Sequence, residues 1–330
     1  MKVLFIGGTG IISSACSELA VAQGIDLYHL NRGQSKSIRN IDGVKHIYAD
    51  IRDVEATAKA IEAHSFDAVV DWIAFTPEHI QNDIQLFSGK TKQFVFISSA
   101  SIYETPPAKL PVTEETPLYN PIWKYSQDKI ACEDLLREEY DRSGFPYTIV
   151  RPSHTYDKTL IPVMGDYTAI HRMKNGLPVV AFGDGSSIWT LTNNKDFAVG
   201  LVGLLGKEKA IGDAFHITNN ELLTWNMIYE LIAKELGVEA KLVYVPSEVI
   251  NKYDKDLGDG LLGDKSCSMI FDNTKIKSIV PEFDPKTPYS EGVKDMVNWY
   301  LGEASDKTVD PHINDLMERI INDHTATPQN

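Results

Sequence analysis

The segment that most constrains this chain is its first 24 residues, MKVLFIGGTGIISSACSELAVAQG. An apolar run at Lys2–Ile6 leads directly into the turn Gly7–Gly10, and an amphipathic stretch follows at Ser13–Gln23. Glycine permits a tight turn and lets backbone N–H groups approach an anion at a helix N-terminus, where the helix dipole favours negative charge. Such a turn between a strand and a helix predicts dinucleotide binding, although the third small position is Ser13 instead of glycine.

The alternation of apolar runs and helical patterns continues to about residue 150. Strands are predicted at Lys2–Ile6, Leu27–Leu30, Lys45–Tyr48, Ala68–Trp72, Gln93–Ile97 and Tyr147–Val150. Helices are predicted at Ser13–Gln23, Val54–His64, Glu78–Phe87 and Trp123–Arg142. Parallel strands that are buried on both faces read as apolar runs separated by helices, so we expect an α/β fold built on a Rossmann-like, doubly wound parallel sheet.

The alternation loosens beyond Arg151. Further elements are predicted as helices at Asp196–Leu205, Thr224–Leu236, Tyr289–Leu301 and Ile313–Asn322, and as strands at Ala214–Thr218 and Lys241–Val245. We therefore expect an NAD(P)-binding Rossmann domain at 1–155, to which the chain returns near 191–219. A smaller, interleaved C-terminal α/β substrate-binding domain, itself discontinuous, is expected at 156–330.

Charge and cysteine usage narrow the class of partner. The formal net charge of −14 disfavours a nucleic-acid or anionic membrane surface, because such surfaces carry basic patches. The three cysteines, Cys16, Cys132 and Cys267, are widely spaced and form no C-x-x-C pair, so neither disulfides nor a metal site is predicted. We find no signal peptide and no apolar run of the ~18 residues that span a bilayer. A cytoplasmic protein with a small-molecule substrate is expected.

The residues after the second predicted strand bear on the choice of cofactor. An NAD site usually has an acidic residue there for the ribose 2′-hydroxyl, whereas this chain has Asn31 and Arg32, with Ser35 and Lys36 nearby. Those groups can bind a 2′-phosphate, so NADP is favoured and NAD is the alternative. A solvated arginine at a strand end is the other reading of Arg32. Asp50, after the third strand, can accept a hydrogen bond from the adenine amino group.

Two further patterns are candidates for the chemistry. Ser98 and Ser99 end the fifth predicted strand, at the edge where α/β sheets bind ligands. Tyr125 and Lys129 lie four residues apart in a predicted helix, which places them on one face. Taken alone, this pair is better explained as an ordinary stripe on a helix surface.

In combination these motifs resemble the extended short-chain dehydrogenase/reductase family, the NAD-dependent epimerases and dehydratases. The matching pieces, in the order typical of that family, are Gly7–Gly10, Asp50, Ser98-Ser99 with Tyr103, Tyr125-x-x-x-Lys129, "IVRP" at Ile149–Pro152, "FGDGSSIWTLTNNKDFA", "FDNTK" and "SEGVKDMVNWY". The resemblance covers roughly residues 1–303.

The resemblance implies a role for each matching residue. Tyr125 would be the acid–base residue, and Lys129, together with an oxidised nicotinamide, would lower its pKa from the usual ~10 and hold the nicotinamide ribose. Ser99 would orient the reacting oxygen. The cofactor would contact Gly7, Gly8, Thr9, Gly10, Ile11, Ile12, Asn31, Arg32, Ser35, Lys36, Asp50, Ile51, Ile97, Tyr125, Lys129 and Pro152. The substrate would contact Ser99, Ser101, His154 and Trp189; for His154 a structural role is equally open, and for Trp189 a core position.

Departures from the family pattern limit the substrate. Dehydrating members have an acidic pair where this chain has Ala100 and Ser101, so 4,6-dehydration is not expected. Trp189 stands where epimerases have an arginine that binds the substrate diphosphate, and Leu261 and Leu262 stand near a second such arginine. Arg172, Lys174 or Lys195 could substitute. Without bidentate arginine contacts a nucleotide-sugar substrate is in doubt.

The expected function is that of an NAD(P)-dependent epimerase or reductase. It would act by hydride transfer on a secondary alcohol or ketone, with a sugar or nucleotide sugar as the substrate. The alternative is a non-catalytic member that senses dinucleotides or binds RNA, as the chloroplast stem-loop-binding proteins do. The resemblance also implies a homodimer through the helices at 78–87 and 122–142.

Overall fold

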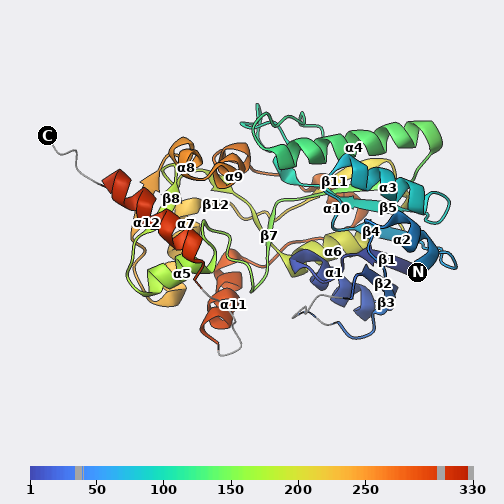
Figure 1. Ribbon diagram of the computed structural model, residues 1–330, viewed down its shortest axis with the longest axis horizontal. Helices are drawn as coiled ribbons and strands as arrows, with labels where there is room; N and C mark the ends of the chain where they lie inside the picture. Colours follow the sequence, from blue (N-terminus) through green and yellow to red (C-terminus); the bar gives the residue numbers. More distant parts are fainter. Residues whose placement is uncertain (34–38, 40, 303–308, 326–330) are drawn as a thin grey trace.

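The computed structural model describes residues 1–33, 39, 41–302 and 309–325. Its centre is a seven-stranded sheet in which every pairing is parallel (Figure 1). In the order β11-β6-β5-β4-β1-β2-β3, these strands are Asp213–Ile217, Tyr147–Pro152, Phe94–Ile97, Ala68–Asp71, Lys2–Ile6, Asp26–Asn31 and Lys45–Tyr48. The chain order reverses between β1 and β4, and doubly wound sheets bind ligands at the carboxyl ends of the strands beside such a reversal.

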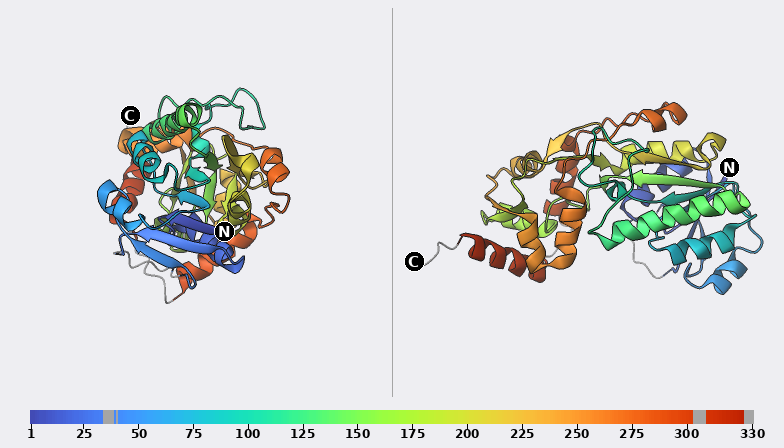
Figure 2. Two further views of the ribbon diagram at one scale, coloured as in Figure 1. Left: turned by 90° about the vertical axis from the view of Figure 1, so that its right-hand side faces the viewer. Right: turned by 90° about the horizontal axis from the view of Figure 1, so that it is seen from above.

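Helices cover both faces of this sheet (Figure 2). One face packs against α1 (Ile11–Ala22), α6 (Asn194–Leu204) and α10 (Thr274–Ile279). The other packs against α2 (Val54–Ala60), α3 (Pro77–Phe87) and α4 (Lys124–Ser143). Alternate residues of β1 enter the two cores, because successive side chains of a strand point to opposite faces. The near-continuous apolar run at the N-terminus is the consequence of this double burial.

A second region lies at the opposite end of the molecule from the N-terminus (Figure 1). It contains three two-stranded pairs: β7 (His154–Tyr156) with β10 (Leu191–Asn193), β8 (Val179–Phe182) with β13 (Leu242–Val245), and β9 (Ile188–Trp189) with β12 (Leu223–Thr224). Its helices are α5 (Tyr167–Lys174), α7 (Trp225–Leu236), α8 (Ser247–Tyr253), α9 (Lys255–Gly260), α11 (Tyr289–Leu301) and α12 (Pro311–Thr325). A π-helical turn, Leu261–Lys265, follows α9, and 3₁₀ turns lie at Ala100–Ile102 and Glu208–Ala210. This region has its own apolar core.

The predicted fold class is confirmed, and the departures from the predicted elements have local causes. The strand predicted at Ala68–Trp72 ends at Asp71, because the Asp71 carboxylate accepts hydrogen bonds from the N–H groups of Ile73 and Ala74 and turns the chain. The helix predicted to reach His64 ends at Ala60. Among the described helices, none combines the length and the apolar composition that crossing a bilayer requires.

Candidate functional site

The glycine turn after β1 is shaped for a close approach of backbone to a ligand. Gly7 has a φ of +85°, a conformation that side chains disfavour. A Cβ atom on Gly8 would lie 2.2 Å from Nε2 of His29, which fills the space beneath the turn. The imidazole of His29 bonds the Ser17 hydroxyl at 2.8 Å, and burial lowers the pKa of His29 to about 4. Position 8 therefore requires glycine, and His29 is a support that the sequence pattern did not indicate.

Ser13 explains how the turn closes without a third glycine. Its hydroxyl accepts a hydrogen bond from Gly10 N–H at 2.8 Å and donates one to the Gly7 carbonyl at 3.1 Å. The first N–H groups of α1, at Ile11 and Ile12, have no acceptor within the helix. Together with the helix dipole they form the cradle that a pyrophosphate fits. The turn is thus compatible with a dinucleotide.

The predicted nucleoside contacts lie along the neighbouring strand ends. The side chain of Asn31 accepts a hydrogen bond from Gly33 N–H at 2.9 Å, so this amide shapes the loop. Arg32 is exposed. The Asp50 carboxylate accepts from Arg52 N–H at 3.0 Å, and Ile51 is buried. Ser35 and Lys36 lie outside the described residues.

The side chain of Lys129 is buried at the carboxyl ends of β4 and β5. Its ammonium group donates to the carbonyl oxygens of Ala74, after β4, and Ile97, at the end of β5, both at 2.7 Å. It also lies 4.7 Å from the ring centroid of Phe96 and 5.7 Å from that of Tyr125. Burial lowers the pKa of Lys129 to about 8, so the group is mostly cationic at neutral pH. The surface-stripe reading is wrong for this lysine.

Tyr125 lies beside the serines that follow β5. The hydroxyl of Ser99 lowers the pKa of Tyr125, but burial has the larger effect and raises that pKa to about 12. The Ser99 hydroxyl lies 2.9 Å from that of Ser101, which in turn lies 2.7 Å from that of Ser126. In the protein without a bound nicotinamide, desolvation therefore dominates the pKa of Tyr125, and the lowering expected with an oxidised nicotinamide bound stays a prediction.

Two adjoining cavities open from these groups. The inner cavity, about 180 Å³, is bordered by Ser99, Ala100, Ser101, Trp123, Tyr125, Pro152, Ser153, His154, Trp189, Asp264 and Lys265. The outer cavity, about 630 Å³, shares Trp123, His154 and Lys265 with it. All four predicted substrate residues thus border the inner cavity. Trp189 is also buried in the core of the second region, so its core position is confirmed and its contact with a substrate stays a prediction.

The predicted substitutes for a diphosphate arginine lie elsewhere. Arg172 donates to Pro178 O and Asn314 Oδ1, both at 2.8 Å, and pairs with Glu318. Lys174 and Lys195 are exposed. Of the described residues, Lys265 is the one basic side chain at the walls of the two cavities besides the neutral His154, and its ammonium pairs with Asp264 at 2.8 Å.

The sequence pattern did not indicate Asp264 and Lys265 as site residues. The π-helical turn Leu261–Lys265 carries both to the inner cavity, and such turns recur at functional sites. The turn is fixed by Asn120, whose side-chain N–H donates to Gly263 O at 2.6 Å. A single π-turn has no periodicity to detect, so only the Gly263-Asp264 pair before "FDNTK" offered a signal.

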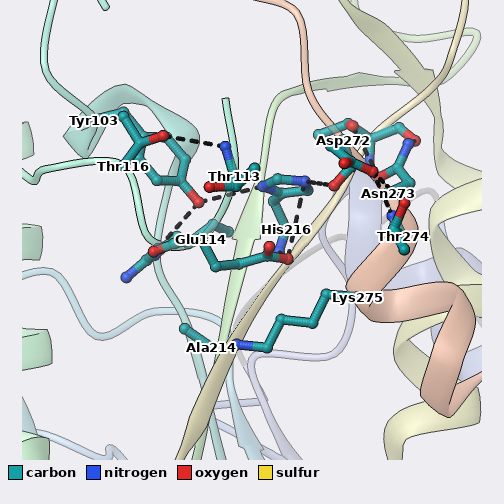
Figure 3. Close-up of polar contacts among 12 residues, drawn as sticks. Tyr103, Thr113, Glu114, Thr116, Ala214, His216, Asp272, Asn273, Thr274 and Lys275 are labelled. Carbon is teal, nitrogen blue, oxygen red and sulfur yellow. Dashed lines mark hydrogen bonds and ion pairs between the residues drawn. The ribbon is translucent and has the colours of Figure 1, made fainter. Parts of the chain in front are cut away.

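A buried polar network links Tyr103, in the segment that follows Ser99, to His216 of β11 and to Asp272 (Figure 3), and Arg151 of β6 joins it through Tyr103. Arg151 donates to the Tyr103 hydroxyl at 3.0 Å, and that hydroxyl lies 3.2 Å from Nδ1 of His216. The other ring nitrogen of His216, Nε2, contacts the Asp272 carbonyl. The backbone N–H of His216 donates to Glu114 Oε1 at 3.1 Å. Burial lowers the pKa of His216 to about 4, so the imidazole is neutral. In the neutral imidazole, Nε2 can donate to the Asp272 carbonyl while Nδ1 accepts from the Tyr103 hydroxyl, so both ring nitrogens of His216 are hydrogen-bonded.

The chain matches known proteins over most of its length. The model of the NAD dependent epimerase/dehydratase family matches residues 3–218. The chloroplast stem-loop binding protein of 41 kDa b from Arabidopsis thaliana is 26% identical over 75% of this chain and 67% of its own length. The 2′-dehydrokanamycin reductase from Streptomyces kanamyceticus is 23% identical over 99% of this chain and 92% of its own.

A solved structure shares the fold. The UDP-glucuronic acid 4-epimerase from Bacillus cereus, determined with UDP-glucuronic acid and NAD, superposes with a TM-score of 0.73 at 20% identity, covering 90% of this chain and 98% of the epimerase. Similarity at this level establishes architecture. The family match covers well over half of the chain and includes the glycine turn, Ser99, Tyr125 and Lys129. This chain therefore belongs to the NAD-dependent epimerase/dehydratase family, the extended short-chain dehydrogenases/reductases.

Proposed function

We propose that this protein is an NAD(P)-dependent oxidoreductase or epimerase that acts on a secondary alcohol, or the corresponding ketone, of a sugar or nucleotide sugar. The observation that carries the proposal is that Tyr125 and Ser99 lie together at the wall of the inner cavity. The buried ammonium of Lys129 lies on the same helix face as Tyr125, 5.7 Å from the centroid of its ring. An acid and an orienting hydroxyl thus border the cavity, and a cation is buried behind the tyrosine ring.

A bound NAD(P) supplies a nicotinamide ring that accepts a hydride from an alcohol carbon or returns one to a ketone carbon. Tyr125 handles the proton. With a pKa near 12 its hydroxyl is protonated at neutral pH, so in the reducing direction it donates its proton to the ketone oxygen. Ser99 donates a hydrogen bond to that oxygen and orients it. The cation of Lys129 stabilises the phenolate that results.

Dehydration is not part of the proposal. The two positions after Ser99, Ala100 and Ser101, have no carboxylic acid to eliminate water. The remaining choice is between an epimerase, which retains its cofactor through a full cycle, and a reductase. Arg32 favours the reductase, because a reductase uses NADPH as a reductant whereas a strict epimerase more often keeps NAD bound.

NADP is the proposed cofactor, with NAD as the alternative. Asn31 offers no carboxylate to a ribose 2′-hydroxyl, and the neighbouring Arg32 is exposed at the strand end. A guanidinium in that position can form charge-assisted hydrogen bonds with a 2′-phosphate.

The second candidate function is a non-catalytic, RNA-binding or dinucleotide-sensing protein. The similarity to the chloroplast stem-loop binding protein favours it. Against it, Ser99, Tyr125 and Lys129 are all present, and the net charge of −14 repels a polyanion. We therefore rank the enzyme first.

The proposal extends to the domain boundary, the cellular compartment and the oligomeric state. A boundary near residue 155 separates the Rossmann domain from the substrate-binding domain, and the chain returns to the main sheet at β11. Free Cys16, Cys132 and Cys267 fit a reducing cytoplasm. A homodimer would use α3 and α4, whose exposed residues, among them Gln81, Gln85, Gln127 and Glu138, are polar. Such an interface would be a wet one.

The direct experiment identifies the cofactor and then the substrate class. Mass spectrometry of the nucleotide released from the purified protein distinguishes NADP from NAD. Ketone and alcohol forms of sugars and nucleotide sugars are then supplied, and the absorbance of the reduced nicotinamide is followed. Turnover that depends on NAD(P) and on Tyr125 supports the proposal. Binding of RNA hairpins without any such turnover would support the second candidate instead.

A further inference from the structure

We propose that the substrate is a phosphate-free glycoside, with its sugar ring in the inner cavity beside Tyr125 and an apolar aglycone in the outer cavity. This inference rests on the proposed function and narrows its substrate class. It departs from the nucleotide sugars of the relative solved with UDP-glucuronic acid. Three features of the walls carry it: the polar inner lining, the apolar outer lining and the distribution of charge.

The inner cavity is lined by groups that bond hydroxyls. Ser99, Ser101, Ser153 and Tyr125 contribute hydroxyl groups, and the Asp264–Lys265 pair adds a carboxylate and an ammonium. At about 180 Å³ the space is below the ~300–1,000 Å³ usual for a complete ligand site. It suits one small ring of a larger substrate.

Two buried nitrogen atoms in this wall have no hydrogen-bond partner among the described residues: Nε2 of His154 and Nε1 of Trp189. Buried polar groups are almost always paired, so such atoms in a cavity wall point to a ligand with hydrogen-bonding groups. Trp189 is only 1% exposed, and it occupies the position where the family pattern has a diphosphate-binding arginine. The ring of Trp189 stacks on Trp225, so what this residue adds to the wall is one neutral N–H and no positive charge, which suits a sugar hydroxyl better than a diphosphate.

The outer cavity has a different lining. Its described wall residues are mostly apolar: Leu160, Ile161, Pro162, Val163, Met164, Phe182, Trp225, Leu257, Leu261 and Ile313. Apolar surface of this extent is stabilised by contact with an apolar ligand group. A nucleotide would place a ribose and a diphosphate against it. An aromatic or aliphatic aglycone matches it better.

Charge argues against a diphosphate more directly. The outer cavity is bordered by Asp166, Asp256 and Asp310, and no arginine borders either cavity within the described residues. Lys265 is already paired with Asp264 at 2.8 Å. A diphosphate placed here would face carboxylates without a bidentate guanidinium partner. Asp166 also has a φ of 48°, unusual for a residue with a side chain, and such backbone outliers cluster at ligand sites.

The test compares matched ligands on the full-length protein saturated with its cofactor. Isothermal titration calorimetry measures Kd for phenyl glycosides of glucose, galactose, mannose and N-acetylglucosamine, for the free sugars, and for the corresponding UDP-sugars. We expect one phenyl glycoside to bind at least about tenfold more tightly than both its free sugar and its UDP-sugar, a difference of ~1.4 kcal/mol. A UDP-sugar that binds more tightly than every phenyl glycoside, or no binding by any phenyl glycoside, overturns the proposal.

Charge-reversal variants test the electrostatic argument. Asp256 is exposed at the cavity border, whereas the Asp310 carboxylate accepts a hydrogen bond from Ile313 N–H at the start of α12, so the charge is reversed at Asp256 alone. D256K should bind UDP-sugars at least about tenfold more tightly while its affinity for the phenyl glycoside stays within about twofold, because only the diphosphate is charged. The matched control is E138K on α4, whose exposed carboxylate borders neither cavity and whose ligand affinities should not change. An equal gain in E138K would contradict a local effect.

The two proposals can fail separately. Tyr125→Phe removes one of the hydroxyl groups that line the inner cavity but retains the aromatic ring, so it should bind the phenyl glycoside at most about tenfold more weakly than the wild type, whereas turnover is lost. If UDP-sugars prove to be the tight ligands and turnover still needs Tyr125, the glycoside inference fails alone. If no ligand that binds supports NAD(P)-dependent turnover, the proposed function fails.

Discussion

The carboxyl groups of Asp71, at the end of β4, and Asp83, in α3, interact with each other in the core. Both side chains are fully buried. Neither Asp83 oxygen, nor Oδ2 of Asp71, has a hydrogen-bond donor among the residues that the structure describes. One of the two acids must therefore supply the donor, and burial beside Asp71 raises the pKa of Asp83 well above its ordinary value. Oδ1 of Asp71 accepts from Ala74 N–H, and the Ala74 carbonyl accepts from Lys129, so the pair supports the loop that holds the lysine.

This arrangement predicts a pH-dependent stability difference between Asp83→Asn and the wild type. A carboxyl group with a raised folded-state pKa takes up a proton on folding, so its stabilisation is present at low pH and is lost as pH rises through that pKa. Asparagine supplies a permanent N–H donor in the same place. As the pH is raised from 5 to 8, the Tm of Asp83→Asn should therefore increase relative to the Tm of the wild type. A difference that is constant with pH would show that no proton is shared.

The ammonium group of Lys129 predicts the alkaline limit of activity. Because burial lowers its pKa to about 8, the cation is lost above that pH, and kcat/KM should fall with it. Lys129→Gln should reduce kcat/KM by roughly 10²–10⁴-fold at pH 7. Lys124→Gln, at an exposed position on the same helix, is the control and should behave as the wild type. A pH profile that is flat to pH 10 would rule out this role.

The cofactor preference can be reversed at Arg32. Replacing this exposed arginine by aspartate removes the partner of a 2′-phosphate and supplies an acceptor for a 2′-hydroxyl. Arg32→Asp should weaken NADPH binding by roughly 10–100-fold, the worth of one charge-assisted hydrogen bond, and leave NADH binding unchanged or improved. Fluorescence titration of both nucleotides measures this. Equal effects on the two would show that the arginine does not read the phosphate.

The ion pair between Arg151 and Glu133 predicts a large stability effect away from the reacting groups. Arg151 donates to both Glu133 oxygens, at 3.0 and 2.7 Å, and both side chains are buried. Glu133→Ala leaves a buried guanidinium without this partner and should cost about 3–5 kcal/mol in the free energy of unfolding. Urea denaturation measures it, with Glu138→Ala on the exposed face of α4 as a control within ~0.5 kcal/mol. Similar losses in both variants would contradict the argument.

The main sheet could be predicted from the apolar runs in the sequence, because the burial that produces each run acts on consecutive residues of one strand. Parallel strands buried on both faces leave apolar runs, and β1 and β3 have the predicted bounds. The positions of Ser99, Tyr125 and Lys129 follow from motif order on that sheet. The two-residue strands β9 and β12 are too short for a period, and each exists only because it pairs with the other.

The parts of the site that sequence did not reveal depend on contacts between distant segments. The outer cavity joins residues from Trp123 to Ile313, and the Asp71–Asp83 pair links a strand to a helix. The burial that raises the pKa of Tyr125 in the protein without a bound nicotinamide could not be predicted for the same reason: the motif shows a neighbouring cation, whereas burial is set by the whole fold.

The central claim is that the Tyr125 hydroxyl transfers the proton in a reaction of bound nicotinamide. The most direct measurement is the pair of kcat and cofactor Kd for Tyr125→Phe, which removes one oxygen atom from a largely buried ring. The account predicts that kcat falls by at least about 10²-fold while cofactor Kd changes by less than about threefold. Turnover that survives in the variant at the wild-type rate would contradict it.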